Sequence, residues 1–487
     1  MAVPCEIAKP RPRIADLLSD TEIAVTLHIY DTMQRQKVQF VPRTEGQVDM
    51  YVCGPTVYDV PHLGHGRTSL TYDVIRRYLE WTGWRVTVAS NVTDIDDKII
   101  NRAETEGRTE PDVAAEFTRA YDEQMERLNI LPAQSRPHAT EFIEGMIDII
   151  SELIDKESAY VVPTRGVYFS VEGLSDYGRL AGRDLAQLLE DAGQRVDVDT
   201  EKRSPLDFAL WKSAKPGEPS WDTPWGSGRP GWHTECVAMS LSALGSGFDI
   251  HGGGDDLCFP HHQNEWAQVT AMGKPFARYW VHSAMVNVAG EKMSKSLGNF
   301  TNLAEAIDTA GPRALRLLAM QTHYRRAMEM GREALAAAST AIDRLDAFER
   351  RMTAANVDLG DGEMEPSVVE GFKAAMDDDF GTPVALDHAF GVVRGANAAL
   401  DEGDLATAGL RARTALTLFS VLGIEIGSPE RSEQPGLDTV EIESLIEQRR
   451  MAREEKDFVS ADQIRDQLAD MGVTLEDTST GVTWHRT

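Results

Sequence analysis

Apolar and polar positions between residues 48 and 100 follow a strand–helix–strand order. The run VDMYVCG (48–54) is β-prone and stops at Gly-Pro, which predicts a strand that ends in a loop. In HLGHGRTSLTYDVIRRYLEWTG (62–83) the apolar residues recur at helical spacing, and the final Gly marks a stop. WRVTVASNVTDIDDKII (84–100) begins as a strand and ends in an acidic turn that leads into another helix. This order predicts the βαβ unit of an open parallel sheet.

The pattern changes several times after residue 140. Helical spacing gives way to a segment rich in Pro, Gly and Trp (215–232), which is typical of a loop. GFDIHGGG (247–254) predicts another strand that runs into glycines. YWVHSAMVNVAGEKMSKS (279–296) has the pattern of a strand pair that turns at an Ala-Gly dipeptide (289–290).

The last third of the chain is mainly helical in pattern. From about 303 to 425 it is rich in Ala, Leu and Arg with helical periodicity, which predicts a helix bundle. The segment 423–438 has the composition of a linker. The last fifty residues predict a small helical module, in which Ser460 and Gln463 have capping-box spacing and Gly472 ends the helix.

Length and cysteine content set broad limits. A chain of 487 residues is longer than one hydrophobic core usually serves, so about two to four domains are expected. Its four cysteines are too few and too scattered for a disulfide framework, which favours a reduced cytoplasm. We expect no membrane span, because no run of about 18 apolar residues occurs. Residues 1–24 lack an apolar signal core and predict a flexible extension.

The formal net charge of −29 allows two interpretations. An acidic surface repels phosphates, which argues against nucleic acid as a partner. Alternatively, the protein is adapted to a salt-rich cytosol, where the Debye length shrinks to about 3 Å at 1 M salt and a local basic patch suffices. The motifs below favour the second interpretation.

Two short motifs carry the chemistry. EKMSKS (291–296) places two lysines on a Gly-flanked loop, which is often merely solvated but can fold over a polyphosphate and stabilise charge on a leaving phosphate. PHLGH (61–65) places His62 and His65 around Gly64 at a helix start, where free N–H groups and the helix dipole favour phosphate. Alone, the second motif is weak, because two such histidines are more often structural.

Together these motifs resemble a known family. KMSKS is the signature of the class I aminoacyl-tRNA synthetases, and HLGH is similar to their HIGH motif, with Leu63 in place of Ile. Within class I the chain most resembles the cysteinyl-tRNA synthetases. The resemblance runs from about residue 25 to the end of the chain, in the pieces YVCGPTVYD, TDIDDKII, RPGWHTEC, FDIHGGGDDL, FPHHQNE, EKMSKSLGNF and DFVSADQIRDQLADMGV.

The resemblance implies an α/β fold with a Rossmann-like parallel-sheet catalytic domain, an insertion, an α-helical bundle and a small C-terminal anticodon-binding module. No room remains for a large extra hydrolytic domain. The implied parts are an N-terminal extension (1–24), the first half of the catalytic domain (25–145), a connective insertion (146–228), the second half of the catalytic domain (229–290), the KMSKS loop and stem-contact region (291–345), the helical bundle (346–426), a linker (427–438) and the anticodon-binding module (439–487).

A metal site is predicted around FPHHQNE (259–265). His261 and Glu265 are four residues apart, so on a helix they share a face and can chelate one ion, although such a pair is often only a surface hydrogen bond. A four-coordinate zinc needs two more ligands and prefers thiolates. Spacing alone points to Cys258. A helix that starts near Pro260, however, places Cys258 before the first turn and off that face.

The resemblance implies a different ligand set. It assigns the zinc to Cys53, Cys236, His261 and Glu265, and it has an apolar residue where Cys258 stands. Cys258 then becomes a packed thiol of the core. His262 is expected to pack beside the ligands.

The reaction that the resemblance implies has two steps. The carboxylate of L-cysteine attacks the α-phosphate of Mg-ATP to give cysteinyl-adenylate, and the terminal ribose hydroxyl of tRNA-Cys then takes the cysteinyl group. His62, Gly64 and His65 would hold phosphates, and Lys292 and Lys295 would stabilise the departing pyrophosphate. Zinc would bind the substrate thiolate, which excludes serine and alanine without an editing domain.

Further residues are expected to bind a substrate, although for some of them a purely structural role is the alternative. Trp232 and Thr68 are assigned to the amino-acid pocket, although core packing would also explain Trp232. Gly252, Gly253 and Asp256 are assigned to the nucleoside. The acidic cluster in TDIDD could hold Mg²⁺, but helix capping and internal hydrogen bonds by Asp94, Asp96 and Asp97 are favoured.

In the tail, Arg453, Asp462, Asp477 and Trp484 occupy positions that resemble anticodon-reading residues, although a solvated helical hairpin is the alternative. The resemblance also implies a cytoplasmic monomer.

Two rival functions remain. A ligase that passes cysteine to an aminosugar amine should lack the tail, and a zinc-stabilised binding protein without catalysis would not need intact KMSKS and HLGH motifs.

Overall fold

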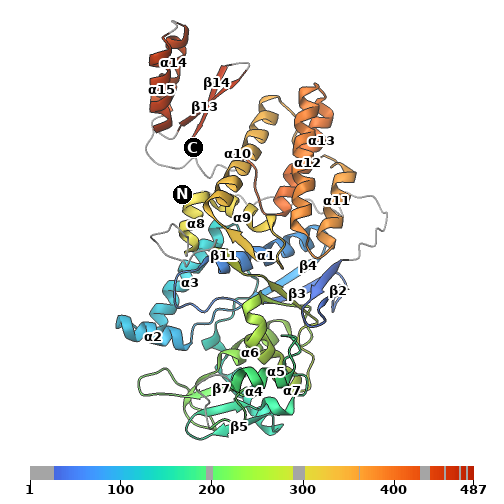
Figure 1. The fold of residues 1–487 in the computed structure, drawn as a ribbon, viewed down its shortest axis with the longest axis vertical. Coiled ribbons are helices and arrows are strands. Elements are labelled where there is room, and N and C mark those ends of the chain that lie inside the picture. Colours follow the sequence, from blue (N-terminus) through green and yellow to red (C-terminus); the bar gives the residue numbers. More distant parts are fainter. Residues whose placement is uncertain are drawn as a thin grey trace, which may run out of the picture. The chain divides into compact units, whose positions relative to one another are not determined.

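The computed structural model describes residues 27–193, 201–288, 302–360, 362–427, 439–454, 457–470, 473–478 and 481–486. The chain divides into two compact units, Met1–Ile426 and Gly427–Thr487 (Figure 1). The extension predicted at 1–24 lies outside the described residues. Within the described ranges, no helix combines the length and the apolar character that a membrane crossing requires.

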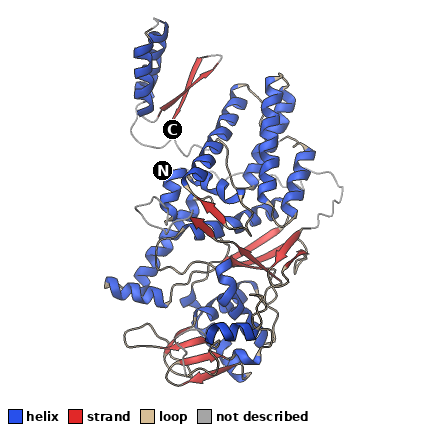
Figure 2. Cartoon of the chain, in the orientation of Figure 1, coloured by secondary structure: helices blue, strands red, loops and turns tan. Residues whose placement is uncertain are grey.

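A parallel sheet of four strands lies at the centre of the first unit, as the strand–helix–strand pattern predicts (Figure 2). Its order is β10-β9-β3-β4, with all neighbouring pairs parallel. Strands from the two halves of the sequence are therefore neighbours, and their carboxyl ends meet at one edge. The strands are β3 (Gln47–Val52), β4 (Arg85–Ser90), β9 (Ile250–Gly254) and β10 (Tyr279–Ser283). A hairpin that the sequence pattern did not predict precedes them, formed by β1 (His28–Asp31) and β2 (Gln36–Gln39).

The two faces of β3 contact different layers. Because side chains alternate along a strand, successive residues belong to opposite faces. Tyr51 and Cys53 pack in the hydrophobic cluster that contains residues of α6 (Trp232–Leu244). The intervening side chains pack with α1 (Leu63–Trp81) and the helical bundle, and they are Val48, Met50 and Val52.

Helix α1 connects β3 to β4 and buries the apolar face that its spacing predicts. The helix ends at Trp81, and Gly83 follows with φ of 99°, a conformation that L side chains rarely adopt. The side chains predicted to form its apolar face are all buried, namely Leu70, Val74, Ile75, Tyr78 and Leu79.

The connective insertion contains helices, as predicted, but also strands that the sequence pattern did not predict. It contains a four-stranded antiparallel sheet in the order β5-β6-β7-β8, which Figure 2 shows apart from the central sheet. The prediction failed at β8 because Gly and Pro occupy a short strand whose partner, β7, satisfies its backbone. The elements are α4 (Ile143–Asp155), β5 (Ala159–Val162), β6 (Gly166–Phe169), α5 (Leu185–Gly193), β7 (Phe208–Ser213) and β8 (Gly228–Pro230).

The acidic segment after β4 has the structural role that was favoured for it. Asp96 caps α2 (Asp97–Glu106) by accepting the backbone N–H of Lys98 at 2.9 Å. Asp94 accepts hydrogen bonds from the backbone and the hydroxyl of Thr140 at 3.0 and 2.7 Å. Asp97 pairs with Lys212 and Arg229, which ties α2 to the insertion. A second helix, α3 (Glu110–Arg127), follows.

The predicted helix bundle is present, with one short strand inside it. That strand, β12 (Met328–Met330), pairs in parallel with β11 (Val286–Val288). The run from residue 279 therefore forms two strands in different sheets, and the predicted turn at 289–290 lies outside the described residues. The helices are α8 (Leu303–Ala310), α9 (Pro312–Gln321), α10 (Arg332–Ala354), α11 (Pro366–Asp377), α12 (Thr382–Asp401) and α13 (Leu405–Val421).

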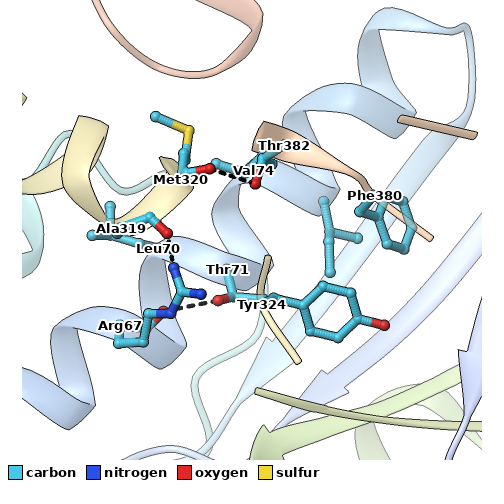
Figure 3. Close-up of a pocket in the computed structure, with 10 residues that line it drawn as sticks. Arg67, Leu70, Thr71, Val74, Ala319, Met320, Tyr324, Phe380 and Thr382 are labelled. Carbon is cyan, nitrogen blue, oxygen red and sulfur yellow. Dashed lines mark hydrogen bonds between the residues drawn. The ribbon is translucent and has the colours of Figure 1, made fainter. Parts of the chain in front are cut away.

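Arg67 joins α1 to the end of α9. Its guanidinium donates to the carbonyls of Ala319 and Thr322, the latter at 2.8 Å, and so satisfies acceptors that the helix end leaves open. Figure 3 shows the contact between Arg67 and Ala319. Both residues line a small, mostly apolar cavity of about 20 Å³, which Tyr324 and Thr382 also line. None of the predicted site residues lines this cavity.

A buried charge network lies further along α1. The carboxylate of Asp73 receives Arg77 Nε at 2.7 Å and a guanidinium N–H of Arg316, and all three side chains are at most 1% exposed. Arg316 also donates to the carbonyls of Leu128 and Leu422, at 2.7 and 2.8 Å. One arginine thus connects α1, α9, the turn after α3 and the end of α13.

The second unit is partly helical. Helices α14 (Thr439–Glu454) and α15 (Phe458–Asp470) are followed by an antiparallel hairpin, β13 (Val473–Thr478) and β14 (Gly481–Arg486), which the helical prediction missed. The predicted cap is also wrong in position. Asp457, not Ser460, caps α15 by accepting the backbone N–H of Ser460 at 3.1 Å. Gly472 lies outside the described residues.

Candidate active site and metal centre

A large cleft opens at the carboxyl edge of the central sheet. It encloses about 760 Å³, and such an edge is where open α/β folds bind ligands. Seven of the residues predicted for the site line it, namely Cys53, His62, Gly64, His65, Thr68, Trp232 and Asp256. Gly252 and Gly253 lie in β9 beneath the cleft, where an added Cβ would meet the ring of Tyr72 at 2.4 Å or that of His262 at 2.8 Å. In the structure, these two glycines permit close packing.

The signature helix begins with a reciprocal cap. The backbone N–H of His65 donates to His62 Nδ1 at 3.4 Å, and that of His62 donates to His65 Nδ1 at 3.2 Å. Their rings stack with centroids 3.8 Å apart. Burial and the neighbouring His62 lower the pKa of His65 to about 3, so its imidazole is neutral at physiological pH. The two side chains thus present a rigid, uncharged pair at the helix start.

Four buried donors converge beside this helix. Cys53 Sγ lies 3.7 Å from Cys236 Sγ and 3.7 Å from Glu265 Oε1, and His261 Nε2 lies 3.1 Å from the same carboxylate oxygen. One donor atom from each of the four lies within 4.8 Å of every other. This is the ligand set that the family resemblance implies, brought together from three distant segments.

The local geometry separates Cys258 from this cluster. Phe259 has extended backbone (φ −140°, ψ 129°) and interrupts the helix after Cys258, whereas His261 and Glu265 lie beyond this break, at the start of α7 (Gln263–Ala271), and share one face. The thiol of Cys258 instead lies 3.5 Å from the carbonyl of Leu180, in the insertion, and it belongs to no donor group found among the described residues. The closeness of Cys258 to His261 in the sequence therefore suggested the wrong ligand, because the backbone at this point directs the Cys258 thiol toward the insertion.

The electrostatics of the cluster are suited to a cation. Burial raises the pKa of the Cys53 thiol well above its ordinary value, and the hydrogen bond with Cys236 adds to this. Burial also lowers the pKa of His261 well below its ordinary value. Within the described part of the chain, the only partners of Glu265 in ion-pair geometry are His251 and His261. Two thiols, a neutral imidazole and an uncompensated carboxylate fit a metal ion, which would supply the missing positive charge.

Further histidines surround the cluster. His251 Nε2 lies 2.8 Å from Glu265 Oε2, and His262 Nδ1 lies 2.8 Å from His282 Nε2. A second donor set, Cys53, His251, His262 and Glu265, also satisfies the distance limits of a metal site. Sequence reasoning named only His262 of these neighbours. A histidine within each of the fully buried strands β9 and β10 could have signalled His251 and His282.

Trp232 forms a wall between the cluster and the cleft. Its indole stacks on His261, with centroids 4.0 Å apart, while His233 Nδ1 lies 3.0 Å from His261 Nδ1. On the other wall, Thr68 Oγ1 lies 3.0 Å from Ser283 Oγ. Trp232, Thr68 and Ser283 thus line the same cleft as Cys53.

Comparisons with known proteins agree with this arrangement. Residues 39–340 match the model of the class I (C) tRNA synthetase catalytic domain, residues 371–426 match the DALR domain, and residues 435–484 match the cysteinyl-tRNA ligase anticodon binding domain. A cysteine–tRNA ligase of Gloeothece citriformis is 46% identical over 95% of this chain and 100% of its own length. One of Carboxydothermus hydrogenoformans is 45% identical over 94% of this chain and 100% of its own length.

The chain belongs to the cysteine–tRNA ligase family. Solved structures of other class I members share the fold. Methionyl-tRNA synthetase of Mycobacterium tuberculosis, in complex with methionyl-adenylate, aligns with a TM-score of 0.56 at 15% identity, over 78% of this chain and 90% of its own. A putative arginyl-tRNA synthetase of Campylobacter jejuni aligns with a TM-score of 0.54 at 13% identity, over 78% of this chain and 93% of its own.

The remaining residues that the family resemblance assigned fall into two groups. Lys292 and Lys295 are outside the described residues. In the second unit, Arg453 and Asp462 are exposed on α14 and α15, and Asp462 pairs with Arg465 at 3.0 Å. Two more lie on the hairpin, where Asp477 opposes Val482 and Trp484 opposes Leu475 in backbone register.

Proposed function

We propose that this chain is a cysteine-specific aminoacyl-tRNA synthetase that activates L-cysteine with Mg-ATP and transfers the cysteinyl group to the 3′ end of tRNA-Cys. The observation that carries the proposal is the position of the four buried donors. One of them, Cys53, lines the cleft that His62, Gly64 and His65 at the capped start of α1 also line. Membership of the cysteine–tRNA ligase family agrees with this chemistry.

Zinc is the metal that the donor set favours, with Cys53, Cys236, His261 and Glu265 as its ligands. Two thiolates, one imidazole and one carboxylate match its preferences. This set is preferred over the one with His251 and His262 for two reasons. It holds both thiols, and Trp232, which lines the cleft, lies directly on His261. When bound, the ion would supply a soft electrophile for the thiolate of the substrate.

The first step needs cysteine and ATP to be held in line. Trp232 and Thr68 would position the amino acid between the donors and α1, so that its carboxylate faces the α-phosphate. The first-turn N–H groups of α1 and the neutral His62–His65 pair would hold phosphate oxygens. Asp256 lines the same cleft and would accept a ribose hydroxyl. The loop of Lys292 and Lys295 would stabilise pyrophosphate as it leaves.

The second step brings in tRNA. The second unit, with Arg453, Asp462, Asp477 and Trp484, would contact the anticodon, and the terminal ribose hydroxyl would attack the adenylate in the cleft. Reduced thiols at the metal site suit a cytoplasmic location. We further propose that the enzyme acts as a monomer, since one chain carries every group named here.

The deciding experiment is ATP–pyrophosphate exchange with the purified full-length chain. Exchange should depend on cysteine, should be lost with serine or alanine, and should be accompanied by charging of tRNA-Cys. Absence of exchange would exclude both ligase functions. Exchange without charging, together with transfer to an aminosugar amine, would favour the related ligase instead.

A further inference from the structure

Tyr51 lies beside the metal-binding donors and has no role in the reaction described above. It is two residues before Cys53 on β3, so both side chains lie on the same face of the sheet. Both pack in the hydrophobic cluster that also contains Cys236. The Tyr51 ring is 0% exposed, and it is fixed by Phe248 and His251, with centroids at 6.3 and 5.3 Å.

The hydroxyl group of Tyr51 is buried without a hydrogen-bond partner of standard geometry among the described residues. Its polar neighbours are the thiols of Cys236 and Cys53 and the carboxyl group of Glu265, and the thiol of Cys236 is within its hydrogen-bonding reach. A buried hydroxyl without a partner costs about 1–3 kcal/mol. The hydroxyl is therefore held near the Cys236 sulfur without a hydrogen bond of standard geometry, although a phenylalanine would fill the same space.

Metal binding would change this balance. A protonated thiol is a weak acceptor, whereas a metal-bound thiolate carries negative charge and accepts hydrogen bonds strongly. We propose that the Tyr51 hydroxyl donates a hydrogen bond to the Cys236 sulfur when that sulfur is a metal-bound thiolate, and that it thereby tunes the metal toward the substrate thiol. The inference rests on the ligand set proposed above. Tyr51 is a positioning and tuning residue, since it reaches the substrate only through Cys236.

The sign of the effect follows from the hydrogen bond. A donor stabilises the sulfur lone pairs, so the sulfur gives less charge to the metal, and the metal becomes more electrophilic toward the sulfur of cysteine. Groups that bond to metal ligands typically change metal affinity about 10–100-fold when removed. The same hydrogen bond stabilises the thiolate against protonation. Loss of the hydroxyl should therefore weaken metal binding at neutral pH as well as the selection of cysteine.

The test compares Tyr51→Phe with the wild-type chain after substitution of the metal by Co²⁺. The thiolate-to-cobalt charge-transfer bands should move to lower energy, because the sulfur electrons are no longer stabilised. Zinc affinity in chelator competition should fall about tenfold or more. Tyr160→Phe is the matched control, because its buried hydroxyl donates to Asp207 at 2.7 Å in the insertion, and it should change neither readout.

Two further variants, one at position 51 and one at Cys236, complete the test. Incorporation of 3-fluorotyrosine at position 51, a stronger donor, should move the bands in the opposite direction even if the phenylalanine variant folds poorly. Bands and zinc affinity that match the wild type in both variants would overturn the inference. If Cys236→Ser keeps the wild-type cobalt spectrum, the ligand set itself is wrong. The failure of the proposed metal site is thereby distinguished from the failure of the role of Tyr51.

Discussion

The indole of Trp232 lies over the imidazole of His261, with ring centroids 4.0 Å apart and ring planes inclined by 25°. One face of the indole is thus occupied by a proposed metal ligand, while the residue also lines the cleft. An aromatic pair of this kind contributes about 0.5–1.5 kcal/mol beyond its burial. The stack orders the ligand and forms the pocket wall at the same time.

Trp232→Ala should raise the KM for cysteine about tenfold, since about 1.4 kcal/mol corresponds to a factor of ten. Trp232→Phe should retain most of the affinity because a ring remains over His261. The measurement is ATP–pyrophosphate exchange at varied cysteine, with the KM for ATP and the zinc content as controls. A KM for cysteine that does not change in Trp232→Ala would contradict the assignment of this residue to the pocket.

Cys53→Ala should abolish stoichiometric zinc binding, and Cys258→Ala should leave it intact. The reason is that Cys53 belongs to the donor cluster, whereas the thiol of Cys258 is directed at the carbonyl of Leu180. Metal content by atomic absorption, measured on both purified variants, checks this. Zinc lost from Cys258→Ala and kept in Cys53→Ala would reverse the proposed site.

Arg316→Met should destabilise the first unit by about 3–5 kcal/mol, because it leaves Asp73 buried with one of its two cationic partners removed. Lys37→Met is the control, since Lys37 pairs with Asp378 at the surface and such a pair is worth at most about 1 kcal/mol. Urea unfolding of both variants gives the comparison. Equal losses would mean that the buried network adds no more than a surface pair.

Stability should fall as the pH drops below about 6.5, partly because of His282. Burial and the neighbouring His251 lower the pKa of His282 to about 3, so the native state keeps it neutral while the unfolded chain binds a proton. This group then removes about 1.4 kcal/mol of stability per pH unit below its unfolded pKa. Its contribution is fully present above pH 6.5 and is lost as the pH falls toward 3.

The matched variant is His282→Gln, measured by urea unfolding at several pH values between 7.5 and 5. It should show a shallower pH dependence than the wild type by about the amount that one histidine contributes. A glutamine can still meet Thr32, which lies 2.8 Å from His282 Nδ1, so the fold should persist. Parallel pH profiles for the two proteins would show that His282 does not titrate on unfolding.

The sequence pattern predicted the central βαβ unit, the face of α1 and the helix bundle, because each shows a clear period over many residues. It missed the strands of the insertion and the hairpin after α15, because short antiparallel strands owe their formation to partners rather than to their own pattern. Pro230 illustrates this, since it lies in β8 opposite Trp211.

The site required different information. Helical periodicity predicted that His261 and Glu265 share a face. No pattern along the sequence predicts that Cys53 lies beside Cys236, and the closeness of Cys258 in the sequence suggested the wrong thiol ligand. The family resemblance supplied the set that the structure brings together. Tyr51 and His282 escaped notice because their importance depends on contacts across the sheet, which spacing along one strand does not reveal.

The convergence of β3, α6 and α7 also sets an order of events during synthesis. Cys53 precedes Glu265 by 212 residues, so the ribosome must make the whole insertion before the last donor exists. A nascent chain that has completed only its first strands carries Cys53 alone of the four proposed ligands. At the proposed site, a four-ligand metal centre can therefore form only after residue 265 has been made and β3 has met α6 and α7.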